Sequence, residues 1–371
     1  MIVRARDLGV AFTGTPGRWN AITDVTGVLV GHTTLIEGNG PLKVGEGPVR
    51  TGVTVIVPRA EPMWLRPAFA GSHRLNGNGE MTGLEWVRQS GMLTSLIALT
   101  NTHSVGVVRD ALVAWEVSQR DPGELFWRLP VVAETFDGVL NDINGQHVRR
   151  EHVIAAIERA SDGRVPEGNV GSGTGMMCHG FKGGIGTASR LVDVGGSTFT
   201  VGVLVQANHG SRRRLSIRGV PIGELITERE VPSAFAALSE GAGSIIGIVA
   251  TDAPMIPNQL DAMAQRVGLG VARNGGLGEH SSGDLFFAFS TANESLAPCD
   301  VQDLGPLTSK FDMISLTYID PFYEAVVEAT EEAIVNSMVA ADTMTGRDNI
   351  TVHRLPHERV TELMPRENRT R

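Results

Sequence analysis

Residues 240–252 join a glycine-rich approach to an uninterrupted run of apolar, mostly β-branched residues. Such a run predicts a buried strand that begins directly after Gly243. Gly243 has no Cβ, so its backbone reaches conformations that are closed to other residues. When the peptide after such a glycine is strained, the hydroxyl of the next residue can attack the preceding carbonyl carbon. The sequence therefore predicts a strand whose first residue, Ser244, is a candidate nucleophile.

Attack by the Ser244 hydroxyl would convert the Gly243–Ser244 amide to an ester, which water would then open. The chain would divide into residues 1–243 and 244–371. Ser244 would keep a free α-amino group that can serve as its own base. A Gly–Ser step taken alone is ordinarily a turn that leads into a strand. The weight of this hypothesis therefore rests on the rest of the sequence.

Composition excludes several classes of partner. The net charge of −9 over 371 residues argues against nucleic acid, because binding phosphates requires a concentrated basic surface. The one basic cluster, residues 212–214, is predicted to be a solvated loop or a subunit contact. No secretory signal and no membrane-spanning run is recognisable, so we predict a cytoplasmic protein that does not bind membranes.

Motif searches favour catalysis without a metal ion or a bound cofactor. Cys178 and Cys299 provide neither a disulfide framework nor a metal quartet and are predicted to be buried thiols. The nearest histidine pair, His353 and His357, is interrupted by Pro356, which breaks a helix. Neither a G-x-S-x-G elbow nor a nucleotide-binding glycine motif is present, and close packing accounts for the glycines of residues 168–186. Nucleophilic acyl chemistry is the class that stays open.

The apolar periodicity predicts alternating strands and helices with short connections. Residues 211–243 are predicted to be an exposed, irregular connection. Helices packed on β-sheet in layers are the expected architecture. Strands are expected at 22–26, 27–34, 52–58, 93–99, 131–133, 199–207, 245–250, 284–289 and 350–352, and helices near 84–88, 107–119, 147–160, 260–271 and 322–341.

Polar side chains stand at the ends of several of these strands. Glu134 follows an apolar strand, although a solvated surface acid is an equally simple explanation for it. Asn208 ends another strand, where its amide can donate into a cleft or simply form a turn. Ser282 and Asp284 are two residues apart, so both point to one face if the strand has already begun there.

Several long motifs in one order resemble the L-aminopeptidase/D-esterase family, which includes the β-peptidyl aminopeptidases. The similarity runs over residues 22–357. The matching motifs are Gly173-Thr-Gly-Met, Gly180-Phe-Lys-Gly-Gly-Ile-Gly-Thr-Ala-Ser-Arg, Val201-Gly-Val-Leu-Val-Gln-Ala-Asn, Gly243-Ser-Ile-Ile, Ala250-Thr-Asp-Ala-Pro, Ser282-Gly-Asp-Leu-Phe-Phe-Ala-Phe-Ser-Thr and Thr343-Met-Thr-Gly-Arg-Asp.

The resemblance implies one catalytic domain with a four-layer αββα sandwich, the layered α/β architecture of N-terminal-nucleophile-like enzymes and ornithine acetyltransferases. It implies self-cleavage into an α segment, 1–243, and a β segment, 244–371. It also implies release of the N-terminal residue from small peptides, amino-acid amides or esters, including D-alanine or β-amino-acid derivatives. Assembly into a homo-oligomer, commonly four αβ units, is a further implication.

Residue roles follow from the same resemblance. Gly243 and Ser244 match the cleavage site and the nucleophile, and Asn208 matches the oxyanion-hole amide. Ser282 matches a second serine, with Asp284 in place of a neighbouring carboxylate that is glutamate in some members. Glu134 matches the acid that binds the substrate ammonium group, and Phe136 stands on the substrate-binding wall where some members have a tyrosine.

Three alternatives stay open. The chain could be an endo-acting amide hydrolase like the nylon-oligomer hydrolases, or an acyl transferase like ornithine acetyltransferase. It could also be an uncleaved, non-catalytic assembly protein that keeps the fold. Within the hydrolase mechanism, either the α-amino group of Ser244 or the pair Ser282–Asp284 could serve as the base.

Overall fold

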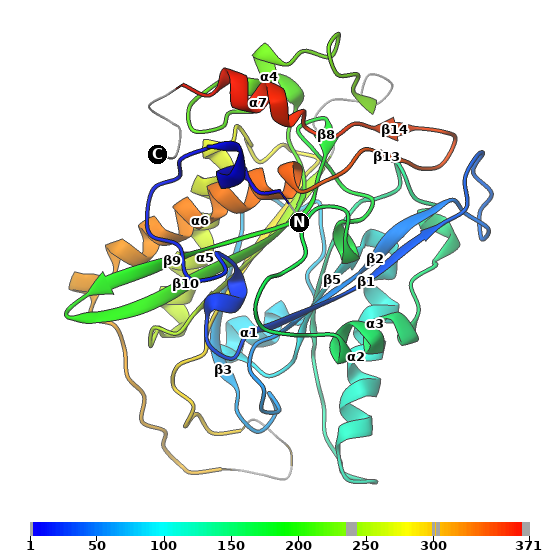
Figure 1. The fold of residues 1–371 in the computed structure, drawn as a ribbon. Coiled ribbons are helices and arrows are strands. Elements are labelled where there is room, and N and C mark those ends of the chain that lie inside the picture. The colour runs from blue at the N-terminus through cyan, green and yellow to red at the C-terminus, as the bar shows by residue number, and fades with distance from the viewer. Residues whose placement is uncertain (1–2, 235–242, 299–300, 302–304, 366–371) are drawn as a thin grey trace.

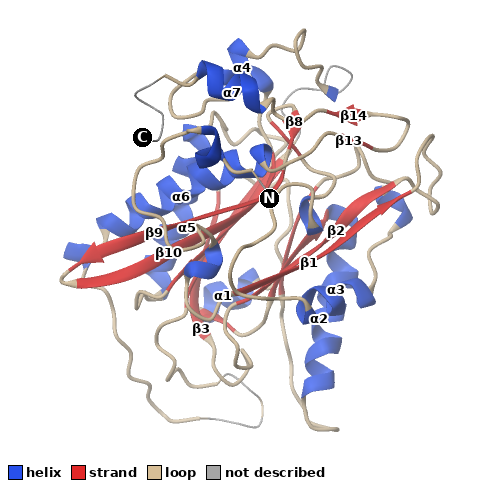
Figure 2. Cartoon of the chain, viewed as in Figure 1, coloured by secondary structure: helices blue, strands red, loops and turns tan. Residues whose placement is uncertain are grey.

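Two stacked β-sheets form the centre of the molecule, and each carries helices on its outer face (Figures 1 and 2). The structure is a computed structural model that describes residues 3–234, 243–298, 301 and 305–365. One sheet has four strands and the other has six. This arrangement confirms the four-layer αββα sandwich. Among the described residues, no helix combines the length and the apolar character that a membrane span requires.

The six-stranded sheet has the order β4-β3-β12-β11-β10-β9. All its neighbours are antiparallel except β11 and β12, which run parallel. The two strands that follow Ser244, β11 and β12, lie between β10 and β3, so both predicted segments build one sheet. Its strands are β3 (Ala68–Arg74), β4 (Met92–Leu93), β9 (Gly184–Val194), β10 (Ser197–Asn208), β11 (Ser244–Thr251) and β12 (Gly283–Ser290).

The four-stranded sheet has the order β1-β2-β5-β6, formed by β1 (Leu29–Glu37), β2 (Val49–Val57), β5 (Ile97–Asn101) and β6 (Val131–Thr135). Helices α2 (Val105–Gln119) and α3 (Arg150–Glu158) cover its outer face, and α5 (Pro257–Arg273) and α6 (Asp320–Val339) cover that of the larger sheet (Figure 1). The shorter elements are α1 (Leu84–Ser90), α4 (Ile222–Leu225), α7 (His357–Leu363), β7 (Met177–Cys178), β8 (Phe181–Lys182), β13 (Met344–Thr345) and β14 (Thr351–Val352).

Strand alternation in β11 determines which way Ser244 faces. Ile246 and Ile248 belong to the core between the two sheets, whereas Ile245 and Val249 belong to the core beneath the helices. Side chains alternate between faces along a strand, so Ser244 shares the inter-sheet side with Ile246 and Ile248. The predicted nucleophile therefore points toward the four-stranded sheet.

Close packing explains the glycines of residues 168–186, as expected. A Cβ at Gly186 would lie 2.0 Å from the carbonyl oxygen of Ala333, and one at Gly184 would lie 2.0 Å from that of Gly168. Both distances are far below van der Waals contact. Only glycine at these positions lets α6 and the preceding loop approach β9 so closely.

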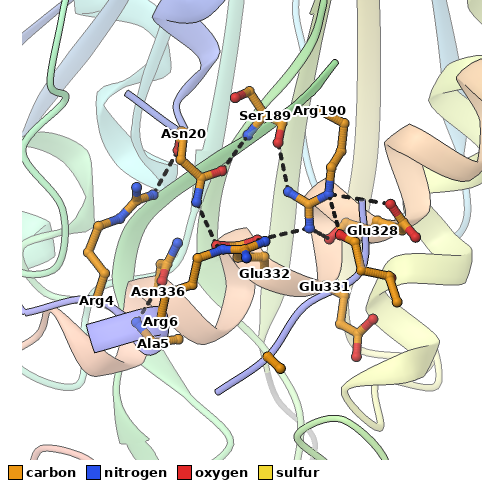
Figure 3. A network of polar contacts seen from close by, with 12 residues as sticks. Arg4, Ala5, Arg6, Asn20, Ser189, Arg190, Glu328, Glu331, Glu332 and Asn336 are labelled. Carbon is orange, nitrogen blue, oxygen red and sulfur yellow. Dashed lines mark hydrogen bonds and ion pairs between the residues drawn. The ribbon is translucent and has the colours of Figure 1, made fainter. Parts of the chain in front are cut away.

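The inner side of α6 is polar where it crosses β9 (Figure 3). Glu332 is fully buried and accepts ion-paired hydrogen bonds from Arg190, at 2.8 Å, and from Arg6, at 2.7 and 2.8 Å. Burial alone would raise the pKa of Glu332, but the hydrogen bond from Arg6 and the charges of Arg190 and Arg6 hold it below its usual value. The amide of Asn20 also donates to Glu332, at 2.6 Å. This network ties the N-terminal segment to the helix layer.

Most expected elements are confirmed within a few residues, but two strand predictions are wrong. Residues 22–26 were expected to form a strand, and Ile22–Asp24 instead form a 3-10 helix whose turn is held by hydrogen bonds from Trp19 N and Ala21 N to the Asp24 carboxylate. The expected strand 93–99 is two strands, β4 and β5, which belong to different sheets. An apolar run does not reveal where the chain crosses from one sheet to another.

The prediction that residues 212–214 form a solvated cluster is wrong for Arg212, which is buried. Its guanidinium lies 3.5 Å from the ring centroid of Phe181 and donates to the carbonyl oxygens of His179 and Gly180. The described part of the predicted connection, residues 211–234 and 243, is not wholly exposed, because Leu215, Ile217, Ile222 and Ile226 are also buried, and it contains α4. Residues 235–242 of this connection lie outside the described residues. Cys178 is buried as predicted, whereas Cys299 lies outside the described residues.

Candidate active site

Three neighbouring strands of the larger sheet bring the predicted site residues together at one edge. Ser244, the first residue of β11, pairs with Asn208 at the end of β10 and with Gly283 at the start of β12. The backbone N–H of Gly283 donates to Ser244 Oγ at 3.0 Å. Ser244 and Asn208 are each 6% exposed. A donor aimed at Oγ stabilises the negative charge that develops on this oxygen as its proton is removed.

Two hydrogen bonds fix the orientation of the Asn208 amide. Its Oδ1 accepts from the backbone N–H of Met177 at 2.8 Å, and its Nδ2 donates to the carbonyl oxygen of Phe136 at 3.0 Å. The oxygen is therefore committed to the loop at Met177. Among the described residues the second N–H of the amide has no acceptor, which is the arrangement an oxyanion donor requires.

Ser282 and Asp284 form the pair that their spacing predicts. Ser282 Oγ donates to Asp284 Oδ1 at 2.5 Å, and the N–H of Ile245 donates to the same oxygen at 3.2 Å. Asn76 Nδ2 donates to Asp284 Oδ2 at 2.9 Å. Burial raises the pKa of Asp284, and the hydrogen bonds from Ser282 and Asn76 offset part of that rise. The carboxylate is thus anchored one residue from the backbone nitrogen of Ser244.

Glu134 lies near the end of β6 and is 3% exposed, so it is not a solvated surface acid. Its Oε1 accepts from the N–H of Glu80 at 2.9 Å, and its Oε2 accepts from the hydroxyl of Thr102. Burial raises the pKa of Glu134, and these two hydrogen bonds only partly compensate. In the part of the chain that the structure describes, no lysine or arginine pairs with Glu134. A buried carboxylate of this kind is well suited to bind a ligand that brings the positive charge.

Phe136 contributes to the site in two distinct ways. Its side chain is 48% exposed, as a residue on the wall of a substrate pocket can be. Its carbonyl oxygen holds Asn208, a contact that side-chain identity does not reveal. Gly243 also touches this region, because a Cβ there would lie 2.2 Å from the carbonyl oxygen of Asn208. Glycine before Ser244 is therefore a steric requirement.

The loop of residues 76–80 completes the site, although no sequence motif pointed to it. Asn76 binds Asp284 through both its side-chain atoms, donating at 2.9 Å and accepting from Asp284 N at 2.6 Å. A Cβ at Gly79 would lie 2.9 Å from Gly283 Cα and 3.3 Å from Glu134 Oε1. The glycine-rich loop thus places the Glu134 carboxylate close to Gly283. The two hydrogen bonds between Asn76 and Asp284 join residues far apart in the chain, and no sequence pattern indicates them.

Lys182 is a second residue whose part in the site only the structure shows. Its side chain is fully buried, and Nζ donates to the carbonyl oxygens of Met176, at 2.7 Å, Gly183, at 2.9 Å, and Gly173, at 3.4 Å. The peptide that joins Met176 to Met177 is the one whose N–H holds Asn208. Burial lowers the pKa of Lys182 to about 7. Lys182 therefore braces the peptide that orients the Asn208 amide.

Comparisons with known proteins agree with this geometry. The model of peptidase family S58 matches residues 20–352. The β-peptidyl aminopeptidase BapA of Sphingosinicella microcystinivorans is 48% identical over 375 residues, covering 99% of this chain and 93% of the relative.

Two solved structures match over almost the whole chain. A β-aminopeptidase from a Burkholderia species superimposes with a TM-score of 0.90 at 50% identity, covering 97% of this chain and 98% of the other. The L-aminopeptidase D-Ala-esterase/amidase of Ochrobactrum anthropi, described as a variant of the Ntn hydrolase fold, gives 0.91 at 44% identity and covers 99% of both chains. The chain therefore belongs to peptidase family S58 and is a hydrolase of the aminopeptidase type.

Proposed function

We propose that this enzyme cleaves itself between Gly243 and Ser244 and then releases N-terminal residues from small peptides, amino-acid amides or esters. In the first step Ser244 Oγ attacks the Gly243 carbonyl carbon and the C–N bond breaks, which leaves an ester. Breaking the C–N bond already frees the α-amino group of Ser244, which takes up the proton from Oγ. Water then hydrolyses the ester to a Gly243 carboxylate and restores the Ser244 hydroxyl. The observation that best supports this proposal is that Ser244, Asn208 and Gly283 lie side by side on adjacent strands.

In turnover, Ser244 Oγ attacks the substrate carbonyl and Asn208 donates to the oxyanion. We assign the α-amino group of Ser244 as the base, because an α-amine with a pKa near 7.7–8.0 is partly neutral at pH 7. The hydroxyl hydrogen of Ser282 is directed at Asp284, which leaves the lone pairs of Ser282 Oγ to accept from an ammonium group. The pair then stabilises the protonated amine rather than removing the proton itself.

Glu134 gives the proposed enzyme its preference for a free amino terminus. Glu134→Gln is expected to lower kcat/KM on amino-acid amides by roughly 10- to 100-fold, because a charged hydrogen bond contributes about 1.5–3 kcal/mol. The wild-type enzyme should hydrolyse N-acetylated amides poorly. Glu80→Gln is the matched control, because this neighbouring acid is exposed and its backbone N–H still reaches Glu134. Equal hydrolysis of free and N-acetylated amides by the wild type would remove this role and favour an endo-acting amidase.

The pH profile offers a second readout of Glu134 in the same experiment. An ordinary glutamate has a pKa of about 4.3. Burial raises the pKa of the Glu134 carboxyl above its usual value, so this group takes up a proton at a higher pH. Binding of the substrate ammonium group is therefore lost as the pH falls through the raised value. The corresponding acid limb should be missing from the kcat/KM profile of Glu134→Gln.

Lys182→Met is expected to lower kcat by about tenfold and to change KM little, because it loosens the peptide that orients Asn208.

The variant should also be less stable, since an unpaired buried polar group costs about 1–3 kcal/mol. Unfolded Lys182 holds its proton to about pH 10.4, whereas in the folded state its pKa is about 7. Wild-type stability should thus rise relative to the variant between pH 7 and 10. Denaturant unfolding across this range tests it, with the exposed Lys43→Met as control.

We also propose that the enzyme is a homo-oligomer, with four αβ units as the expected assembly. Support comes from residues 305–318, an extended connection on the outside of the molecule (Figure 1). Large exposed apolar side chains concentrated on one segment mark an interaction surface. The exposed side chains of this segment are Leu307, Phe311, Met313, Leu316 and Tyr318.

The substrates named for the relatives, β-peptides and D-alanine derivatives, share one requirement that this site meets. A free ammonium group beside the scissile carbonyl can reach a buried carboxylate, whether one or two carbons separate the two groups. We therefore propose α- and β-amino-acid amides as the substrate class. Acyl transfer to an amine in place of water remains the second candidate, because Ser244 would form the same acyl-enzyme in both reactions.

A further inference from the structure

Three side chains with metal-binding atoms meet beside the two segments that orient the Asn208 amide. Cys178 in β7, His179 in the turn that follows, and His209 just after β10 have potential ligand atoms that all lie within 4.8 Å of one another. Each of these residues is at most 3% exposed. None of them takes part in the reaction proposed above. A thiol and two imidazoles form the soft donor set that binds Zn(II) and Cu(I) rather than Mg²⁺ or Ca²⁺.

The hydrogen bond of His179 leaves one ring nitrogen ready to coordinate. Its Nδ1 lies 3.1 Å from the carbonyl oxygen of Ser211. A carbonyl can only accept, so Nδ1 carries the hydrogen and the neutral ring has its lone pair on Nε2. Nε2 is buried and has no hydrogen-bond partner among the described residues. Metal-ligating histidines almost always donate their other N–H in this way, which fixes the ring orientation.

The spacing between Cys178 and His209 matches ligands of one ion. Cys178 Sγ lies 3.8 Å from His209 Nδ1. With a metal–sulfur bond of about 2.3 Å and a metal–nitrogen bond of about 2.0 Å, these atoms would be roughly 3.7 Å apart at a trigonal angle and about 3.5 Å at a tetrahedral one. The observed distance is nearer the trigonal value, and three protein ligands are what the cluster provides.

The backbone holds the cluster in place without an ion. His179 N donates to His209 O at 2.7 Å, which joins the two ligand-bearing segments. His179 has a φ of 50°, an uncommon conformation for a residue with a side chain. A Cβ at Gly210 would lie 2.3 Å from His179 Cε1, so only glycine admits the imidazole at this point. The local backbone geometry therefore positions the three ligand side chains before any ion binds.

Charge selects the ion. The positive charges of Arg212 and Arg214 act on His179, and the only ligand that can become negative is the Cys178 thiolate. Cu(I) with one thiolate and two neutral imidazoles has no net charge, whereas Zn(II) with the same ligands would bury one positive charge beside two arginines. An uncompensated buried charge is costly. We propose that Cys178, His179 and His209 form a trigonal binding site for a Cu(I) ion.

This metal site would be linked to the Asn208 amide through residues that are adjacent in the sequence. Met177, whose N–H holds Asn208 Oδ1, precedes Cys178, and Asn208 itself precedes His209. A bound ion would restrain both segments that orient the amide. The ion is thus expected to stabilise the native state rather than to take part in bond breaking.

Anaerobic titration of the full-length protein with Cu(I), in competition with a chromophoric chelator, tests the proposal. A Cys299→Ser background removes the other thiol, which lies outside the described residues. We expect one equivalent of Cu(I) per chain, and X-ray absorption should show one sulfur and two nitrogen ligands. Cys178→Ala and His179→Gln should each lose this equivalent, while the exposed His280→Gln should keep it.

A thermal unfolding scan keeps the test decisive if either variant fails to fold. Ligand binding to the native state raises Tm with concentration, so Cu(I) should raise the Tm of the Cys299→Ser protein by several degrees. No bound equivalent, or a coordination shell without sulfur, would overturn the proposal. Tighter binding of Zn(II) than of Cu(I) in parallel titrations would also overturn it, because it contradicts the charge argument.

Discussion

Ser244→Ala is expected to leave the chain as a single band near 39.5 kDa on a denaturing gel, with no measurable hydrolysis of amino-acid amides. The wild-type protein should give two bands, and N-terminal sequencing of the smaller one should begin at Ser244-Ile-Ile-Gly. The same hydroxyl serves self-cleavage and turnover, so one substitution removes both. Loss of a serine nucleophile costs on the order of 10⁶-fold in kcat in a well-studied protease.

Ser281→Ala is the matched control, because its side chain is exposed one residue before Ser282. This variant should be cleaved and active. The cut chains should stay associated under native conditions, since β11 and β12 lie between strands of the first segment. A wild-type protein that runs as one band and is inactive would indicate the non-catalytic assembly protein, and one that is intact and fully active would refute self-cleavage.

Asn208→Ala is expected to lower kcat by roughly 10²- to 10³-fold with little change in KM. Removing one oxyanion donor raises the barrier by about 2.7–4 kcal/mol, and this interaction forms only once the carbonyl becomes tetrahedral. Self-cleavage passes through a similar intermediate, so the appearance of two bands should slow as well. Steady-state kinetics on one amino-acid amide and a time course on gels measure the two effects.

Asn208→Asp separates loss of the donor from loss of volume. An aspartate keeps the size of the side chain and an oxygen for Met177 N, but it has no N–H to offer an oxyanion. It should therefore be as slow as Asn208→Ala. Asn208→Ser is a poor probe because its hydroxyl can still donate. A near-normal rate in Asn208→Ala, with the Tm unchanged, would exclude the oxyanion role.

The sequence located the central strands and their polar ends because these signals are local. The apolar run after Ser244 and the run before Asn208 each became strands of the larger sheet, close to the expected bounds. The spacing of Ser282 and Asp284 predicted that both side chains point to one face if a strand had begun there. The structure brings them into contact, although β12 begins only at Gly283. Long ordered motifs supplied the four-layer sandwich through a family resemblance.

Residues whose partners include backbone atoms placed by the folded chain were the ones that the sequence did not reveal. Lys182 stands out in the sequence only as one residue of a glycine-rich motif, yet it supports the peptide that holds Asn208. The basic cluster 212–214 predicts a solvated loop or a subunit contact, although backbone carbonyls and the ring of Phe181 enclose Arg212. Asn76 gave no signal at all. Each of these side chains bonds to at least one backbone atom, and no pattern of residue types records where a backbone N–H or carbonyl oxygen will point.

The amino-acid sequence by itself determined the strand that begins at Ser244, the glycine that must precede it and the family to which the chain belongs. These features depend on neighbours in the chain, where sterics and alternation act directly. Only the tertiary structure decided that Ser244, Asn208 and Gly283 lie side by side, that Glu134 is buried opposite them, and that Cys178 meets two histidines. The side-by-side placement of Ser244, Asn208 and Gly283 exists only once the larger sheet has formed, because its strands come from distant parts of the chain. Cys178 likewise meets His209 only once the segments that carry them have folded together.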